Sequence, residues 1–275
     1  MLQLAGIAID AVSIGGVETC IQLPGYKLAM DIGRCPRSAV YRDTVLITHG
    51  HMDHIGGICY HTATRALIGL EPPTYLVGHE NIKPLAELFA AYRRLDHSRL
   101  PHHVVPIGPG EEHRLDSGQI VRPFRSLHRV PCQGYGIWSQ KNKLKAEYQG
   151  VPGPELARLR KSGVAISDTV ETPDLAFCGD TLIDVVEREE VVRKARLLML
   201  EVTFVDDRVS VEECRSTGHI HIDELAERAE LFENEAILLT HFSARYRARE
   251  IREAIRTRLP ERLAARVTPL LTGHD

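Results

Sequence analysis

The chain has 275 residues, of which 43% are hydrophobic, and its 34 basic and 37 acidic side chains give a net charge of −3. This is enough apolar material for a sizeable core, arranged as one large domain or two small ones. No apolar run approaches the ~18–20 residues of a membrane helix, and the start lacks the features of a signal peptide. The six cysteines include no CxxC pair. We therefore expect a cytoplasmic protein with reduced thiols and no cysteine-based zinc site.

Strand and helix patterns alternate along most of the chain. The N-terminal half predicts strands at 3–12, 17–23, 27–32, 44–48, 74–78, 103–106, 119–127 and 134–139, with helices at 54–68 and 81–94. The C-terminal half predicts strands at 174–178, 196–201, 236–240 and 266–270, with helices at 183–193, 222–232 and 247–257. Elements interleaved in this way predict an α/β fold in which two sheets pack face to face with helices outside.

The string 48–54, Thr-His-Gly-His-Met-Asp-His, carries four potential metal ligands directly after an apolar run that predicts a buried strand. Alternate residues of an extended segment point the same way, so His49 and His51 can reach one metal ion. Asp53 and His54, at the next turn, would face a second ion. Such a motif is a hypothesis that needs a matching structural context.

Three further residues of ligand type, His128, Asp180 and His241, each follow a short apolar run. One such residue alone is more often a core histidine or a helix cap. Strand ends at one edge of a sheet bring distant segments together, so the repetition favours a shared two-metal site. Imidazole and carboxylate ligands suit Zn²⁺, with Mn²⁺ or Fe²⁺ as alternatives.

Basic residues are concentrated in two segments. The segment 140–172 is polar, with glycine and proline at its centre, and predicts an excursion from the core. Its basic residues, candidates for nucleic-acid contacts or simply solvated charges, are Lys141, Lys143, Lys145, Arg158, Arg160 and Lys161. The second segment, 245–266, holds eight arginines and three glutamates, and this mixture favours a solvated amphipathic helix.

The 48–54 string, His128, the Gly-Asp-Thr triplet at 179–181 and Thr240-His241 together resemble the metallo-β-lactamase superfamily. The segments 200–204, 218–219 and 240–246 look like the signature elements of ribonuclease Z, the tRNA 3′-processing endonuclease. The segments 13–16 and 31–36 look like the short, plant-type branch of that family. The resemblance covers nearly the whole chain.

The resemblance implies a four-layer αββα sandwich forming a single domain over 1–275, with 140–172 as a short substrate-binding arm. It also implies a homodimer that acts on precursor tRNA. Under this resemblance His49, His51 and His128 bind the first metal ion, His54, His241 and Asp53 bind the second, and Asp180 bridges the two.

Catalytic roles also follow from the resemblance. A water between the ions would ionise near neutral pH and attack phosphorus, with Asp53 orienting and deprotonating it. His219, held and polarised by Glu201, would protonate the leaving group. Glu201 follows a very apolar run, where an unpaired carboxylate would be unfavourable. Ser243 and Arg245 would hold a phosphate or brace the metal loop.

One position departs from many bacterial relatives, which have Gly-His-Ser-Thr where this chain has Gly-His-Ile-His at 218–221. We expect His221 to be an ordinary residue at the start of the following helix. The alternative is that it shares the proton-donor role with His219.

The metal site alone indicates a zinc-dependent hydrolase. The resemblance implies the leading prediction, an endoribonuclease that removes the 3′ trailer from precursor tRNA and leaves a 3′-hydroxyl on the discriminator nucleotide. The alternative is a hydrolase of the same fold that acts on a small phosphodiester or other ester. A third hypothesis is a non-catalytic RNA-binding subunit, and the complete set of ligands argues against it.

Overall fold

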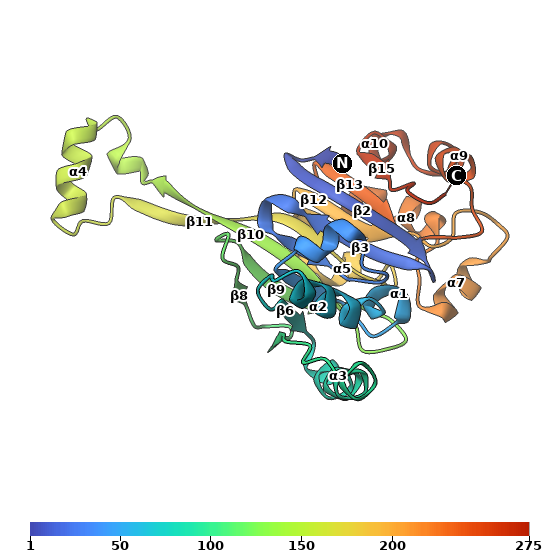
Figure 1. Ribbon diagram of the computed structural model, residues 1–275. Coiled ribbons are helices and arrows are strands. Elements are labelled where there is room, and N and C mark those ends of the chain that lie inside the picture. The colour runs from blue at the N-terminus through green and yellow to red at the C-terminus, as the bar shows by residue number, and fades with distance from the viewer. Residues whose placement is uncertain (275) are drawn as a thin grey trace.

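The computed structural model describes residues 1–274 and shows two mixed β-sheets packed face to face, with helices over their outer surfaces (Figure 1). This confirms the predicted αββα arrangement. In spatial order the first sheet contains β1 (Leu2–Leu4), β2 (Ile7–Gly15), β3 (Glu18–Leu23), β4 (Leu28–Met30), β5 (Thr44–Ile47), β6 (Thr74–Val77) and β7 (His103–Pro106), with β14 (Phe242–Ser243) beside β2. The second contains β15 (Val267–Pro269), β13 (Ala236–Thr240), β12 (Leu197–Glu201), β11 (Ser167–Phe177), β10 (Gln133–Leu144), β9 (Ile120–Arg125) and β8 (His113–Arg114).

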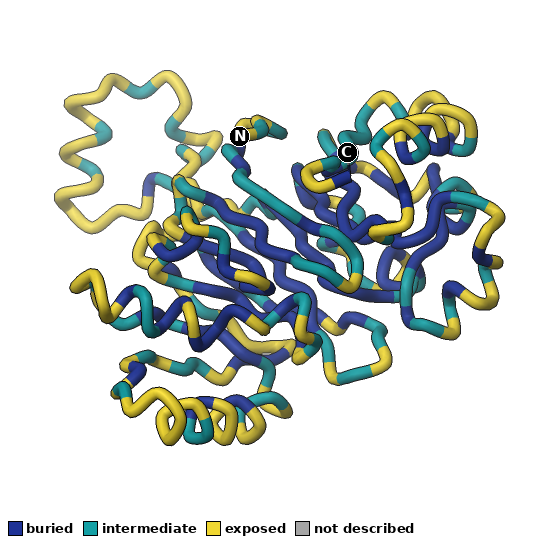
Figure 2. Tube along the Cα trace, turned by 45° about the vertical axis from the view of Figure 1, so that its right-hand side comes forward, coloured by how far each residue is buried: buried dark blue, intermediate teal, exposed yellow. Residues whose placement is uncertain are grey.

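The central strands are apolar throughout because both of their faces are buried (Figure 2). In β5, Leu46 points into the core between the sheets, whereas Val45 and Ile47 point into the outer core beneath the helices. In β12, Met199 faces the inner core and Leu200 the outer one. Continuous apolar runs therefore form strands here, although such runs lack the polar–apolar alternation of half-exposed strands.

Helices complete the outer layers. The first sheet is covered by α2 (Ile58–Leu67) and α3 (Ile82–Asp96), and the short α1 (Met52–Ile55) precedes α2. The second is covered by α5 (Val185–Arg188), α6 (Glu190–Lys194), α7 (Val211–Thr217), α8 (Ile222–Glu227), α9 (Ala248–Arg258) and α10 (Glu261–Ala264). Within residues 1–274, no helix has the length and apolar character needed to cross a membrane.

Several predicted boundaries were wrong. The strand expected at 3–12 is two strands, because the chain turns at Ala5 and Gly6 with φ of 47° and 77°. The helix expected at 54–68 is broken at Gly56 and Gly57, where a Cβ on Gly57 would lie 2.5 Å from the carbonyl oxygen of Ile32. The helix at 183–193 is divided into α5 and α6, the helix at 222–232 ends at 227, and α7 was not predicted.

The excursion at 140–172 is a projecting hairpin that we call the arm. Strands β10 and β11 pair antiparallel beyond the core as far as Leu144 and Ser167. The connection between them contains the exposed helix α4 (Gly153–Lys161), which buries none of its residues. Figure 1 shows the arm extending from one end of the molecule, away from α1 and α7.

Candidate metal centre and active site

Potential ligands from both sheets meet at one edge of the molecule. His49 and His51 follow β5, and Asp53 and His54 lie in α1 immediately afterwards. His128 follows β9, and the segments after β11 and β13 supply the remaining two positions, Asp180 and His241. The structure thus brings together residues separated by almost two hundred positions in the chain.

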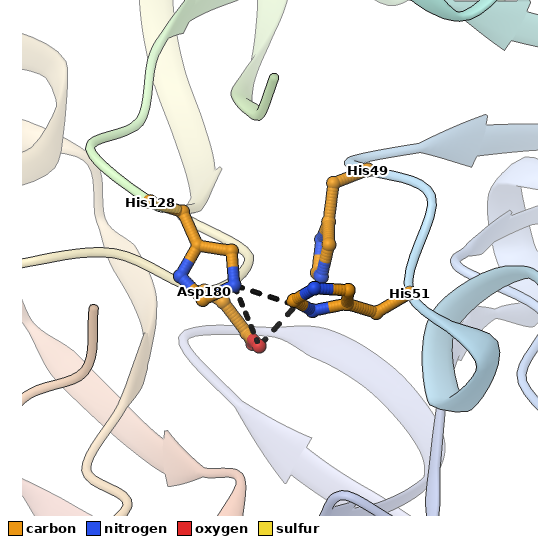
Figure 3. A group of neighbouring side chains, drawn as sticks. All are labelled: His49, His51, His128 and Asp180. Carbon is orange, nitrogen blue, oxygen red and sulfur yellow. Dashed lines mark hydrogen bonds and ion pairs between the residues drawn. The ribbon is translucent and has the colours of Figure 1, made fainter. Parts of the chain in front are cut away.

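The first group contains His49, His51, His128 and Asp180, each offering one ligand atom within 4.8 Å of the others. Figure 3 shows their side chains converging from three separate segments. His51 Nδ1 lies 3.3 Å from His128 Nε2, and Asp180 Oδ2 lies 3.7 Å from His49 Nε2.

The second group contains Asp53, His54 and His241. His54 Nε2 lies 3.3 Å from His241 Nε2, which in turn lies 3.4 Å from Asp53 Oδ2. The other oxygen of Asp180, Oδ1, lies 3.3 Å from His54 Nε2 and 3.4 Å from His241 Nε2. Asp180 therefore presents one oxygen to each group, as a bridging carboxylate must.

The polar atoms of these groups fit two divalent cations. His49 Nε2 and Asp180 Oδ1 are buried without a hydrogen-bond partner among the described residues. An unsatisfied buried polar atom is unfavourable, and a cation in contact with both groups would satisfy them. The donor set of five imidazoles and two carboxylates is the one that Zn²⁺ accepts.

Protonation also favours metal binding in the first group. Burial lowers the pKa of His49 to about 2, and the charge of neighbouring His54 adds to this effect. Burial likewise lowers the pKa of His51 and His128. These rings are therefore neutral at pH 7 and keep a lone pair available, as a metal ligand requires.

Most ligand rings are held through their second nitrogen. His54 Nδ1 lies 2.7 Å from Asp31 Oδ2, and Asp31 is itself fixed by the backbone N–H of Thr48 at 2.8 Å. His128 Nδ1 donates to the carbonyl of Gly218 at 2.9 Å. Such contacts orient a ring and direct its other nitrogen toward the metal.

Sequence reasoning missed the role of Asp31, although this carboxylate at the end of a predicted strand was an available signal. Replacing Asp31 by asparagine should lower the affinity for Zn²⁺ by roughly 10- to 100-fold, because His54 loses its anionic partner. Competition with a chromophoric chelator measures this affinity. Asp116→Asn, which changes an exposed carboxylate, is the matched control. Equal affinities in the two variants would contradict the bracing role.

His219 lies beside both groups and is held by a buried carboxylate. Its Nδ1 is 2.8 Å from Glu201 Oε1, and its ring stacks on that of His241 at 5.3 Å between centroids. Glu201 is 1% exposed and also accepts hydrogen bonds from Thr181 N and Thr203 Oγ1. Burial alone would lower the pKa of His219, but the charge and hydrogen bond of Glu201 outweigh it and raise the pKa to about 9. A pKa above 7 makes the ring a proton donor at neutral pH.

His221 is used within the fold instead. It caps the start of α8 from the preceding position, and its Nδ1 accepts from the backbone N–H of Asp223 at 3.2 Å. Its Nε2 donates to the carbonyl of Asp206 at 3.1 Å, and the residue is 2% exposed. This is the helix-start position expected from the sequence, and it leaves neither ring nitrogen for a substrate.

Two clefts flank the centre. One of about 550 Å³ lies beside His128 and is also lined by Arg125 and Arg129. The other, of about 460 Å³, lies beside Asp53 and is also lined by Arg34. The centre is therefore open to solvent on two sides, each with an arginine that can attract an anion.

The predicted RNA contacts fall into two separate places. Six of the predicted contact residues lie on the arm. Two of these six form ion pairs, Lys145 with Asp168 at 3.8 Å and Arg158 with Glu155 at 2.9 Å, and are therefore partly neutralised. Ser243 lies in β14 next to His241, and the Arg245 guanidinium lies 5.6 Å from the centre of the Phe204 ring. The arm of one chain and its metal centre lie at different ends of the molecule (Figure 1).

Comparison with solved structures supports the fold. The metallo-β-lactamase fold protein YhfI from Bacillus subtilis gives a TM-score of 0.65 at 16% identity, covering 96% of this chain and 97% of that one. Human tRNase Z, short form, gives a TM-score of 0.60 at 18% identity, and the match covers 96% of each chain.

Comparison of sequences identifies the family. A model of the β-lactamase superfamily domain matches residues 32–242. A tRNase Z of Arabidopsis thaliana is 46% identical, covering 99% of this chain and 98% of its own. A chloroplastic tRNase Z of the same plant is 38% identical, covering 99% of this chain and 77% of its own. With such identity along nearly its whole length, the chain belongs to the tRNase Z family of the metallo-β-lactamase superfamily.

Proposed function

We propose that this protein is the endoribonuclease that removes 3′ trailers from precursor tRNA, with two Zn²⁺ ions as its cofactors. The observation that supports the proposal is Asp180, which presents one oxygen to each ligand group beside His219, whose ring Glu201 holds at 2.8 Å. Mn²⁺ and Fe²⁺ remain alternatives, since the same imidazoles and carboxylates bind them. Relatives that carry the tRNase Z name supply the substrate class.

The seven residues of the two groups would hold the ions, which when bound supply a nucleophile at neutral pH and neutralise charge on the phosphoryl oxygens. Asp53 is placed to orient the attacking water. Burial would raise its pKa, but the hydrogen bond from His241 and the charge of His54 hold the pKa well below its usual range. Asp53 is therefore ionised and able to accept a hydrogen bond from that water.

His219 would protonate the 3′-oxygen that leaves the discriminator nucleotide. Its Nδ1 is engaged by Glu201, so the proton available to a substrate is the one on Nε2. Proton donation of this kind contributes roughly 10²–10⁴-fold to rate. The acid is positioned by Glu201, which itself does not touch the substrate.

A second candidate is hydrolysis of a small phosphodiester or other ester. The volumes of the two clefts, about 550 and 460 Å³, fall in the range of small-molecule sites. Parallel assays with a 3′-extended tRNA and with bis(p-nitrophenyl) phosphate separate the two functions, because only the first requires recognition of folded RNA. A non-catalytic role is the weakest candidate, since every ligand of both groups is present.

We further propose that the active species is a homodimer. The arm points away from the metal centre of its own chain (Figure 1), so a second copy is needed to place an arm near that centre. Mixing a chain with a neutralised arm and a chain carrying Asp180→Ala tests this arrangement. Recovery of precursor cleavage on mixing supports an arm that acts across the dimer, and no recovery contradicts it.

Neutralising the arm by replacing Lys141, Lys143, Lys145, Arg158, Arg160 and Lys161 with glutamine should raise KM for precursor tRNA far more than KM for bis(p-nitrophenyl) phosphate. Only the folded RNA has phosphates distant from the scissile bond. Each lost phosphate contact should also flatten the dependence of log affinity on log salt by ~0.7–0.9. Glu147→Gln, which removes an exposed negative charge from the same arm, should have the opposite effect. Equal impairment of both substrates would mean that the arm supports the fold instead.

Precursor tRNA is thus the proposed partner, and the cytoplasm is the proposed compartment. All six cysteines are free, and five of them are buried, as expected in a reducing environment. Imaging a tagged chain in its source cells would test the compartment, and an organellar signal would contradict it.

A further inference from the structure

The eight arginines between 245 and 266 divide into two sets with different surroundings. The C-terminal four are satisfied within the fold. Arg256 contacts Glu253, Arg258 contacts Asp207 and Asp223, and Arg262 contacts Glu230, all within 3.0 Å. Arg266 donates to the carbonyls of Phe232 and Asn234. Their positive charge is therefore largely used within α9 or in contacts with α8 and the loops around it.

The N-terminal four are Arg245, Arg247, Arg249 and Arg252, which we call the arginine cluster. All are exposed, and within residues 1–274 none of them forms an ion pair. The one acidic residue among them, Glu250, is paired with Arg208 at 2.8 Å. The cluster thus carries an uncompensated positive charge on a chain whose net charge is −3.

The arginine cluster directly follows the loop that carries the metal-ligand candidate His241. It begins four residues after His241, and α9 begins within about 25 Å of that residue even for a fully extended chain. The backbone N–H of Ser243 donates to the carbonyl of Thr203 at 3.0 Å, and the Tyr246 hydroxyl contacts Asp206 at 3.2 Å. These contacts bind the cluster to the segment that follows Glu201.

Two of the four charges share one side of α9. Ile251 and Ile255 are buried and turn one side of α9 toward the sheet. Arg249 and Arg252 are exposed and three residues apart, so they are neighbours on the outer side of the helix. Guanidinium groups can form paired hydrogen bonds with phosphate oxygens, so these two neighbours suit an RNA backbone.

We propose that the arginine cluster is a phosphate-binding surface that holds the RNA backbone close to the scissile bond, separately from the arm. This inference rests on the proposed function. RNA is favoured over other anionic partners because the cluster adjoins the centre where a phosphodiester must lie. The arm cannot supply this contact within the same chain, since it projects from a different end of the molecule (Figure 1).

The test compares two matched double variants, Arg249→Gln with Arg252→Gln, and Arg256→Gln with Arg262→Gln. Each removes two exposed arginines, but only the first pair lacks partners in the fold. Fluorescence anisotropy measures the affinity of each for a 3′-extended tRNA. The first variant should bind roughly fivefold or more weakly at ~0.1 M salt, and its salt slope should fall by ~1.4–1.8, whereas the second should match the unmodified protein.

A shortened RNA with only the acceptor stem and trailer identifies the region contacted. The loss of affinity in the first variant should persist with this RNA, because the cluster lies near the cut. Equal losses in both variants, or unchanged affinity and salt slope in the first, would overturn the proposal.

Binding and cleavage distinguish failure of this inference from failure of the proposed function. If the unmodified protein binds the tRNA without cutting it, the proposed function fails, and the paired affinities still decide the role of the cluster. If the unmodified protein cuts the tRNA and the first variant binds normally, only the inference about the cluster fails.

Discussion

Replacing Asp180 by alanine is expected to remove both metal ions and to lower turnover by roughly 10³-fold or more. Its two oxygens face different ligand groups, so no other side chain of this site can take its place. Without it, five imidazoles and Asp53 must hold two dications, and the charge of one buried carboxylate is lost. Elemental analysis of the purified variant measures metal content, and hydrolysis of bis(p-nitrophenyl) phosphate measures turnover.

Asp116→Ala, which removes an exposed carboxylate, is the control for this experiment and should retain close to two ions per chain. Circular dichroism should show that Asp180→Ala remains folded, because Asp180 lies in the segment after β11 and not within a strand or helix. Two tightly bound ions in the variant would show that Asp180 is not a bridging ligand.

Replacing His219 by alanine should lower kcat for precursor tRNA by roughly 10²–10⁴-fold, with little change in KM, because the leaving oxygen loses its acid. His221→Ala should have a much smaller effect on kcat. It should instead destabilise the protein by about 0.5–2 kcal/mol, since His221 caps α8. Single-turnover cleavage and thermal unfolding of both variants separate the two roles, and similar losses of kcat would mean that the acid is misplaced.

The pH profile gives a further readout for His219. Glu201 raises the pKa of this ring, so its acidic form is present at low pH and is lost as the pH rises through the raised pKa. Glu201→Gln should therefore move the alkaline limb of kcat to lower pH. An unchanged limb would exclude His219 as the group that titrates there.

The ligand groups could be anticipated because each depends on local sequence. A strand that ends in His-x-His, followed by Asp and His at the next turn, places its ligands through strand geometry alone. The remaining positions each follow an apolar run, and the α/β pattern brings such strand ends to one edge. The His219–Glu201 contact was inferred from family resemblance, and the structure places the two side chains 2.8 Å apart.

Other features depend on contacts that the sequence does not show. The break between α1 and α2 arises because Gly57 packs against the carbonyl of Ile32, a partner on a different segment. The role of Asp31 depends on its proximity to His54, which follows from the pairing of β4 with β5. Neither of these two contacts produces a periodic pattern in the sequence that could predict it.

The basic segment at 245–266 is another case in which the sequence does not show the contacts. An amphipathic helix was expected there, and α9 agrees, with Ile251, Ala254 and Ile255 buried. The density of arginines could not reveal which of them are paired, because their partners come from distant segments. Asp207 and Asp223 contact Arg258, and Glu230 contacts Arg262, whereas the arginine cluster has no such neighbours in the described chain.

Incubation with a 3′-extended precursor tRNA, followed by mapping of both product ends, tests the central claim most directly. We expect a single cut on the 3′ side of the discriminator nucleotide, with a 3′-hydroxyl on the tRNA and a 5′-phosphate on the trailer. Removal of metal with a chelator should abolish the cut, and Zn²⁺ should restore it. An intact precursor under conditions in which bis(p-nitrophenyl) phosphate is hydrolysed would contradict the account and favour a small-molecule phosphodiesterase.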